Sequence, residues 1–158
     1  MKKLLFVFIS FLVFGLSNSA FSQTSTLDNE KGTSMQPIID GLSATIKAVE
    51  DEKAEIVRME FDLIFKDGSK ESQRELFPDY SYGVMVWGDY RIKKMAINVY
   101  KQNASGGWDF VTTGEMKDFI STAYVTPTEK ALYKFEIIAP EFYEGFTAGH
   151  YGMLLLHN

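Results

Sequence analysis

The chain has 158 residues, with 16 Lys and Arg against 21 Asp and Glu, no cysteine, and 46% apolar residues. This length suits one ordinary domain, and the apolar and aromatic content is sufficient for a packed core. Because cysteine is absent, a disulfide framework and a cysteine-ligated zinc site are both excluded.

Residues 1–22 have the three parts of a secretory signal peptide of bacterial type. Met1 to Lys3 is a short basic start, residues 4–16 are an almost unbroken apolar run, and small residues precede a cleavage point at Gln23. The alternative is a transmembrane anchor, but a helix of this apolar run spans only ~20 Å of a ~30 Å hydrocarbon core. We therefore expect export to the periplasm or the cell exterior.

Removal of these residues takes away two lysines and lowers the net charge from −5 to −7. Such a surface repels phosphate backbones, so a nucleic-acid partner is not expected. The only basic concentration is Arg91, Lys93 and Lys94, which we interpret as part of a solvated loop and strand start. No membrane span is expected in the mature chain.

Residues 23–33 are polar without an apolar period, which is typical of a flexible leader. Residues 34–158 then form the predicted single domain. Ser34 and Pro37 suit a helix start, and apolar residues recur every three or four positions between Met35 and Glu50. The spacing predicts an amphipathic helix over Met35–Glu50, with its stripe packed against the core. The stripe consists of Ile38, Ile39, Leu42, Ile46 and Val49.

From Glu55 the period changes from 3.6 to 2. Apolar residues occupy the odd positions 57–65, while Arg58, Glu60 and Asp62 lie between them. This alternation predicts a strand that buries Val57, Met59, Phe61, Leu63 and Phe65 on one face. A helix continuing through the segment is the alternative. Asp67-Gly68 favours the strand, because it predicts a hairpin turn into a return strand over Glu71–Phe77.

The rest of the chain repeats short alternating segments at intervals of about ten residues. Turn residues such as Gly88-Asp89, residues 103–107 and Pro127 separate them. The whole of residues 55–158 therefore predicts a mainly β fold. We expect an antiparallel β-sandwich of about eight strands with Greek-key or jelly-roll connections, preceded by one helix.

Several short strings resemble the bacterial pre-peptidase C-terminal (PPC) domain and its secreted relatives. They are Tyr82-Gly83-Val84, Gly88-Asp89, Ile97-Asn98-Val99-Tyr100, Val125-Thr126-Pro127, Tyr133 to Ile137 and Gly149 to Gly152, spread over Glu71–Asn158. The resemblance implies a secreted β-sandwich that assists folding, export or surface binding without chemistry of its own. Members often carry a D-x-D pair proposed to hold calcium. Here Lys94 and Ala96 stand at those positions, so the resemblance implies no calcium site in this chain.

Catalytic and metal-binding patterns are weak. His150 and His157 lie seven residues apart in one strand and so point to opposite faces. Glu141 and Glu144 flank an aromatic pair, but nothing local places two carboxyls at the separation a glycosidase needs. No catalytic residue, metal site or cofactor is predicted, and the protein is expected not to be an enzyme.

Aromatic side chains are the remaining candidates for function. Trp87, Tyr90 and Trp108 are the candidate ligand-binding residues within a larger aromatic group that also holds Tyr100, Tyr124, Phe142, Tyr143 and Phe146. Exposed aromatics on a β-sandwich stack on sugar rings or anchor a protein partner. The sequence thus favours a non-catalytic secreted or periplasmic binding or envelope accessory protein. The alternatives are a carbohydrate-binding module and coverage of these aromatics by the helix or a loop.

Overall fold

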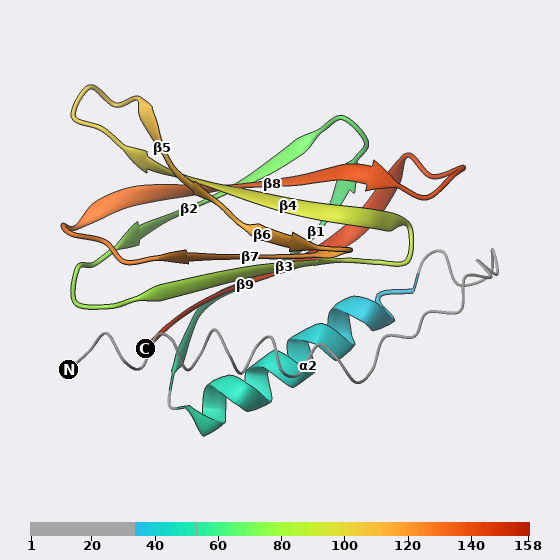
Figure 1. The fold of residues 1–158 in the computed structure, drawn as a ribbon, viewed down its shortest axis with the longest axis horizontal. Helices are drawn as coiled ribbons and strands as arrows, with labels where there is room; N and C mark the ends of the chain where they lie inside the picture. The colour runs from blue at the N-terminus through green and yellow to red at the C-terminus, as the bar shows by residue number, and fades with distance from the viewer. Residues whose placement is uncertain (1–33, 53) are drawn as a thin grey trace.

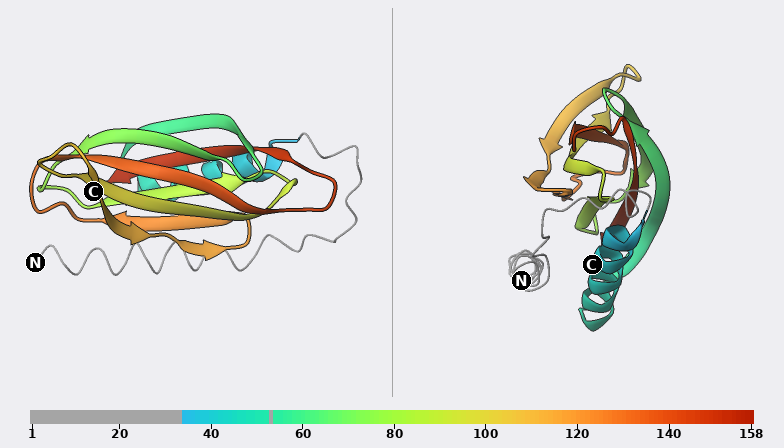
Figure 2. Two further views of the ribbon diagram at one scale, coloured as in Figure 1. Left: turned by 90° about the horizontal axis from the view of Figure 1, so that it is seen from above. Right: turned by 90° about the vertical axis from the view of Figure 1, so that its right-hand side faces the viewer.

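The computed structural model describes residues 34–52 and 54–158; the predicted signal peptide and leader lie outside them. In these residues one helix precedes nine strands, and every strand pair is antiparallel. Sheet A has the order β1-β9-β3-β7-β6, and sheet B has the order β2-β8-β4-β5. The two sheets face one another, with helix α2 on the outer side of sheet A (Figures 1 and 2). The predicted β-sandwich with one preceding helix is confirmed.

The elements follow the predicted segments closely, with one addition. They are α2 (Gln36–Asp51), β1 (Glu55–Phe65), β2 (Ser69–Leu76), β3 (Tyr82–Gly88), β4 (Ile92–Gln102), β5 (Trp108–Thr113), β6 (Glu115–Lys117), β7 (Ile120–Val125), β8 (Ala131–Phe142) and β9 (Ala148–His157). The short strand β6 was not predicted, because three residues are too few to show an alternating pattern.

Most strands bury the face that their alternation predicts. The main core lies between the sheets and is built largely from alternate residues of β3, β4, β8 and β9. Its members include Tyr82, Val84 and Val86 of β3, Met95, Ile97 and Val99 of β4, Tyr133, Phe135 and Ile137 of β8, and Tyr151, Met153 and Leu155 of β9. Removal of this apolar surface from water supplies the main driving force for the sandwich.

Helix α2 forms a second, smaller core on the outside of sheet A. Ile38, Leu42 and Val49 of the helix are buried against Trp87 and other apolar residues of β3 and β9. Packing of the predicted stripe is therefore confirmed at these three positions, whereas Ile39 remains exposed. Because the helix covers the outer face of β3, that strand is buried on both faces.

The predicted burial of β1 is wrong. Its pairing with β9 places Phe61 opposite Gly152 on the helix side of sheet A, where Met59 is 40% and Phe61 48% exposed. Phe65 is exposed on the same side, while Ile64 is the fully buried residue of the strand. An alternating pattern shows which side chains share a face of the strand, but not which of the two faces meets the core. In β1 the face that carries Met59, Phe61 and Phe65 is the outer one. An extra residue at Ile56–Arg58 bends the strand and turns Val57 inward.

The turn after β1 also differs from the predicted hairpin. Asp67 adopts a left-handed conformation (φ 62°), and the Gly68 amide donates to the Phe65 carbonyl, which makes a tight turn. However, β1 pairs with β9 and β2 pairs with β8, so the two strands belong to different sheets. Their inward side chains meet across the gap, where Lys70 Nζ lies 2.6 Å from a carboxylate oxygen of Asp62. Polar side chains thus close this side of the sandwich.

The opposite side is closed by the backbone itself. β5 in sheet B runs through Gly114 directly into β6 in sheet A. The Gly114 amide donates to the Ile97 carbonyl at 2.7 Å, and a Cβ at this position would lie 2.5 Å from both Ile97 and Ser121 side-chain atoms. Only glycine allows so close an approach, so this bend depends on its missing side chain.

Candidate ligand-binding face

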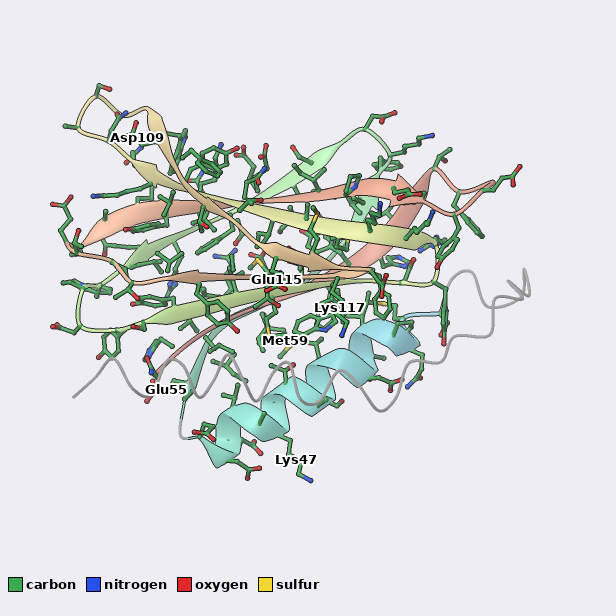
Figure 3. The ribbon with its side chains drawn as sticks, in the orientation of Figure 1. Lys47, Glu55, Met59, Asp109, Glu115 and Lys117 are labelled. Carbon is green, nitrogen blue, oxygen red and sulfur yellow. The ribbon has the colours of Figure 1, made fainter. Side chains whose placement is uncertain are left out.

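Aromatic side chains gather on the outer face of sheet B, away from helix α2. Tyr100 of β4 lies opposite Phe110 of β5, and their rings meet edge to face with centroids 5.8 Å apart. Trp108 follows on the same face of β5, opposite Gln102. Phe110 is 61% exposed, the most exposed of the large apolar side chains in the described residues. Asp109, between the two β5 aromatics, lies at the end of the molecule away from α2 (Figure 3).

Lys134 of β8 organises these rings. It lies opposite Tyr100, and its Nζ is 4.8 Å from the Tyr100 ring centroid and 5.2 Å from that of Trp108. The same ammonium is 2.9 Å from a carboxylate oxygen of Glu71 on β2. A cation held between two ring faces restrains both side chains. We call Tyr100, Trp108, Phe110 and Lys134 the aromatic platform.

A polar border adjoins the platform. The Glu136 carboxylate accepts hydrogen bonds from Asn98 Nδ2 and from the Tyr100 hydroxyl, both at 3.0 Å. Partial burial and the neighbouring Glu136 raise the pKa of Tyr100 above its usual value, so the phenol stays protonated at neutral pH. Asn98 also accepts from the Thr113 hydroxyl at 2.8 Å. The border therefore offers a fixed set of hydrogen-bond donors and acceptors beside the rings.

The loop between β4 and β5 is held in place by one side chain. Asn103 Oδ1 accepts from the amides of Ser105 and Gly107 and from the Ser105 hydroxyl, and its Nδ2 donates to Asp109 at 2.9 Å. Such a loop is ordered before any ligand arrives, which reduces the entropy cost of binding. It flanks the platform at the Trp108 end.

The three candidate residues from the sequence do not come together. Trp87 is only 2% exposed and lies beneath α2, where a Cβ on Gly41 would be 2.4 Å from its Nε1. Trp87 is thus covered by the helix, as the alternative interpretation held, and it cannot contact a ligand in this fold. Tyr90 lies half-buried in the β3–β4 turn. Only Trp108 lies on the aromatic platform.

The sequence did not point to Phe110 and Lys134 as site residues. The alternating pattern places each of them on the face of its strand that lies outside the core. This outward position is the one signal in the sequence that could have indicated them. Cross-strand register then brings Lys134 opposite Tyr100 and Tyr100 opposite Phe110. Register between strands distant in sequence is not visible in a single chain's pattern.

The charged residues considered in the sequence have structural partners. Arg91 pairs with the buried Asp89, whose carboxylate also accepts from the His150 amide at 2.8 Å. The Lys93 and Lys94 ammonium groups both contact Glu141 and hold the pKa of that carboxyl below its usual range. A general acid needs the opposite shift, toward a raised pKa. Arg91, Lys93 and Lys94 are thus paired with carboxylates and do not form a basic patch.

Within the described part of the chain, no group of three or more His, Asp or Glu side chains is placed to hold a metal ion. In residues 34–52 and 54–158, no helix has the length and apolar character needed to cross a membrane.

No model of a known family matches the chain, and no curated protein matches it. Solved structures do match at low identity over 64% of the chain. A protein from Sulfurospirillum deleyianum is 9% identical with a TM-score of 0.42 over 98% of its own chain. The mitogen of Yersinia pseudotuberculosis is 11% identical with a TM-score of 0.41 over 84% of its chain. A protein described as CBM4 is 11% identical with a TM-score of 0.39 over 74% of its chain.

Proposed function

We propose that the protein is a non-catalytic, exported binding module that takes a carbohydrate on the aromatic platform of sheet B. One observation carries this proposal: Tyr100, Trp108 and Phe110 share one outer face and adjoin a polar border of fixed geometry. The layout of residues 1–22 supports export. The resemblance to the PPC domain stays a prediction and is not needed for this argument.

The platform combines the two kinds of contact that a sugar ring requires. A pyranose presents C–H groups on its faces, which pack on aromatic rings, and hydroxyls at its rim, which need donors and acceptors. Phe110 supplies an accessible ring, and Trp108 extends the apolar surface along β5. The Glu136 carboxylate and the Lys134 ammonium match hydroxyl groups at the rim.

The carboxylates of this face support binding rather than hydrolysis. Glu136 accepts from two neutral donors, and Glu71 pairs with Lys134. Each carboxylate is thus engaged by hydrogen-bond donors on neighbouring strands. A glycosidase needs one carboxyl kept protonated and facing a second across the scissile bond.

A glycan array followed by calorimetric titration tests the proposal. The protein is purified from the exported fraction, and its intact mass gives the position of the N-terminus. We expect binding to at least one glycan class. Phe110→Ala and Trp108→Ala should each weaken that binding about tenfold, which corresponds to ~1.4 kcal/mol of lost stacking.

Phe65→Ala is the matched control, because Phe65 is 58% exposed but lies on sheet A. Its glycan affinity should equal that of the unmodified protein. Absence of binding across the array, or equal losses in the Phe110 and Phe65 variants, would refute the platform as a carbohydrate site.

A further inference from the structure

Strand β1 has a free edge. It pairs only with β9 among the described strands, and its other side carries no ladder. The Lys66 amide donates to Thr147 on the β9 side, whereas the Leu63 amide donates to the Asp62 carboxylate. Because backbone groups alternate in direction along a strand, Met59 and Phe61 also direct their N–H and C=O groups to the free edge. The edge is therefore able to accept another strand.

Along this edge, apolar side chains lie on the outer face of the sheet and charged side chains lie on the inner face. On the outer face, Ile56, Met59 and Phe61 are 40–48% exposed, beside the helix that covers the neighbouring strands. Met59 lies on the helix side of the sheet (Figure 3). A run of exposed apolar side chains on a strand edge marks an interaction surface. The inner face of the same segment carries Arg58 and Glu60 instead.

We propose that two copies of the chain pair through β1, antiparallel, about a twofold axis at Met59. A twofold interface requires a surface complementary to itself. In this register Arg58 of each copy faces Glu60 of the other. On the outer face Met59 meets its own counterpart, and Phe61 of each copy lies opposite Val57 of the other, next to Ile56.

The charges select this register over its neighbours. Moving the axis by one residue to Glu60 would place two Glu60 carboxylates opposite each other. Moving it to Phe61 would place Glu60 opposite Asp62 of the second copy. Like charges directly opposite on paired strands are destabilising, and opposite charges stabilise the pair. Within each copy, Arg58 already contacts Glu60, so both side chains lie at the edge in a defined place.

The sandwich favours this side for association. β5 and β6 close the other side by crossing between the sheets, whereas on this side β1 and β2 are joined by the turn at their end and by polar side chains along their length. The aromatic platform lies on the outer face of sheet B, away from β1. Carbohydrate binding and self-association are therefore separate properties, and failure of one does not decide the other.

Light scattering after size-exclusion chromatography, over a dilution series, tests the pairing. The unmodified protein should have twice the mass of the chain and dissociate on dilution. R58E and E60R should each be monomeric, because every facing pair becomes like-charged. A mixture of R58E and E60R should regain the dimer mass, because the facing charges are again opposite.

The control is R74E on β2, the neighbouring edge strand, which should remain dimeric. Circular dichroism verifies that each variant is folded. A monomeric unmodified protein at every concentration overturns the proposal. So does an R58E variant that stays dimeric, or a mixture of folded R58E and E60R that stays monomeric.

Discussion

Phe135 and Phe61 both lie within long strands, yet Phe135 is completely buried and Phe61 is half exposed. Phe135 lies in β8, which is paired on both sides and faces the core between the sheets. Phe61 lies on an edge strand and faces outward beside α2, where 48% of its side chain stays exposed. The contribution of a phenylalanine to stability therefore follows from its neighbours and not from the strand pattern around it.

Truncating these two side chains should have very different effects. Phe135→Ala should lower the free energy of unfolding by about 3–5 kcal/mol, because it leaves a cavity in the main core. Phe61→Ala should cost only about 1 kcal/mol. Urea unfolding measures both, in an R58E background so that self-association does not contribute. Equal losses would show that Phe61 is packed in solution.

The same contrast shows what the sequence could predict. Alternation identified the inward residues of β3, β4, β7, β8 and β9. In β4, β7 and β8 the apolar side chains lie chiefly where they face the main core, whereas β3 and β9 are apolar on both faces because α2 covers the outer one. In β1 it identified the strand but not its inward face, since Glu60 and Asp62 face inward and contact Ser72 and Lys70 of β2. Which face of β1 is inward therefore depends on side chains of β2, which lie eight and twelve residues further along the chain, beyond the turn that joins the two sheets.

At the scale of elements, α2 and β3 fit together through one pair of residues. Gly41 allows the helix to lie against the indole of Trp87, which is itself buried. The sequence predicted the helix and its stripe, within which a glycine is otherwise an unfavourable residue. The position of the helix on sheet A, which hides Trp87 and leaves Trp108 on the opposite sheet, is a tertiary feature without a local signal.

Gly41→Ala should therefore destabilise the protein, although alanine favours a helix by about 1 kcal/mol over glycine. The added Cβ would lie 2.4 Å from the nitrogen of an indole that is only 2% exposed, so the helix or the ring would have to shift. We expect a net loss of about 1–3 kcal/mol from overpacking. Thermal unfolding monitored by circular dichroism measures it. Ser43→Ala, at an exposed position of the same helix, is the control and should be neutral or slightly stabilising.

At the scale of the whole molecule, burial of tyrosines links stability to alkaline pH. Tyr151 lies in the main core, and burial together with the nearby Glu60 and Asp62 raises its pKa to about 12. Burial also raises the pKa of Tyr133 and Tyr124. A phenol in the unfolded chain ionises near pH 10. The folded state therefore holds its protons longer, and this contribution to stability is complete below about pH 10 and lost as pH rises toward 12.

Tyr151→Phe tests this link, because it removes one of the titrating groups. Between pH 8 and pH 11 the unmodified protein should lose about 1.4 kcal/mol more unfolding free energy than the variant. Urea unfolding at the two pH values gives the comparison. An equal loss in both proteins would mean that Tyr151 ionises in the folded state as readily as in the unfolded chain.

The place of β9 in sheet A has a consequence for how the chain matures. β9 lies between β1 and β3 and bonds to both, although more than fifty residues separate it from either strand. While the ribosome is still making residues 89–147, β1 and β3 have no shared partner, so sheet A cannot close. Contacts between such distant segments form late. Under the proposed export, this order keeps the emerging chain open enough to be threaded through a membrane before it folds.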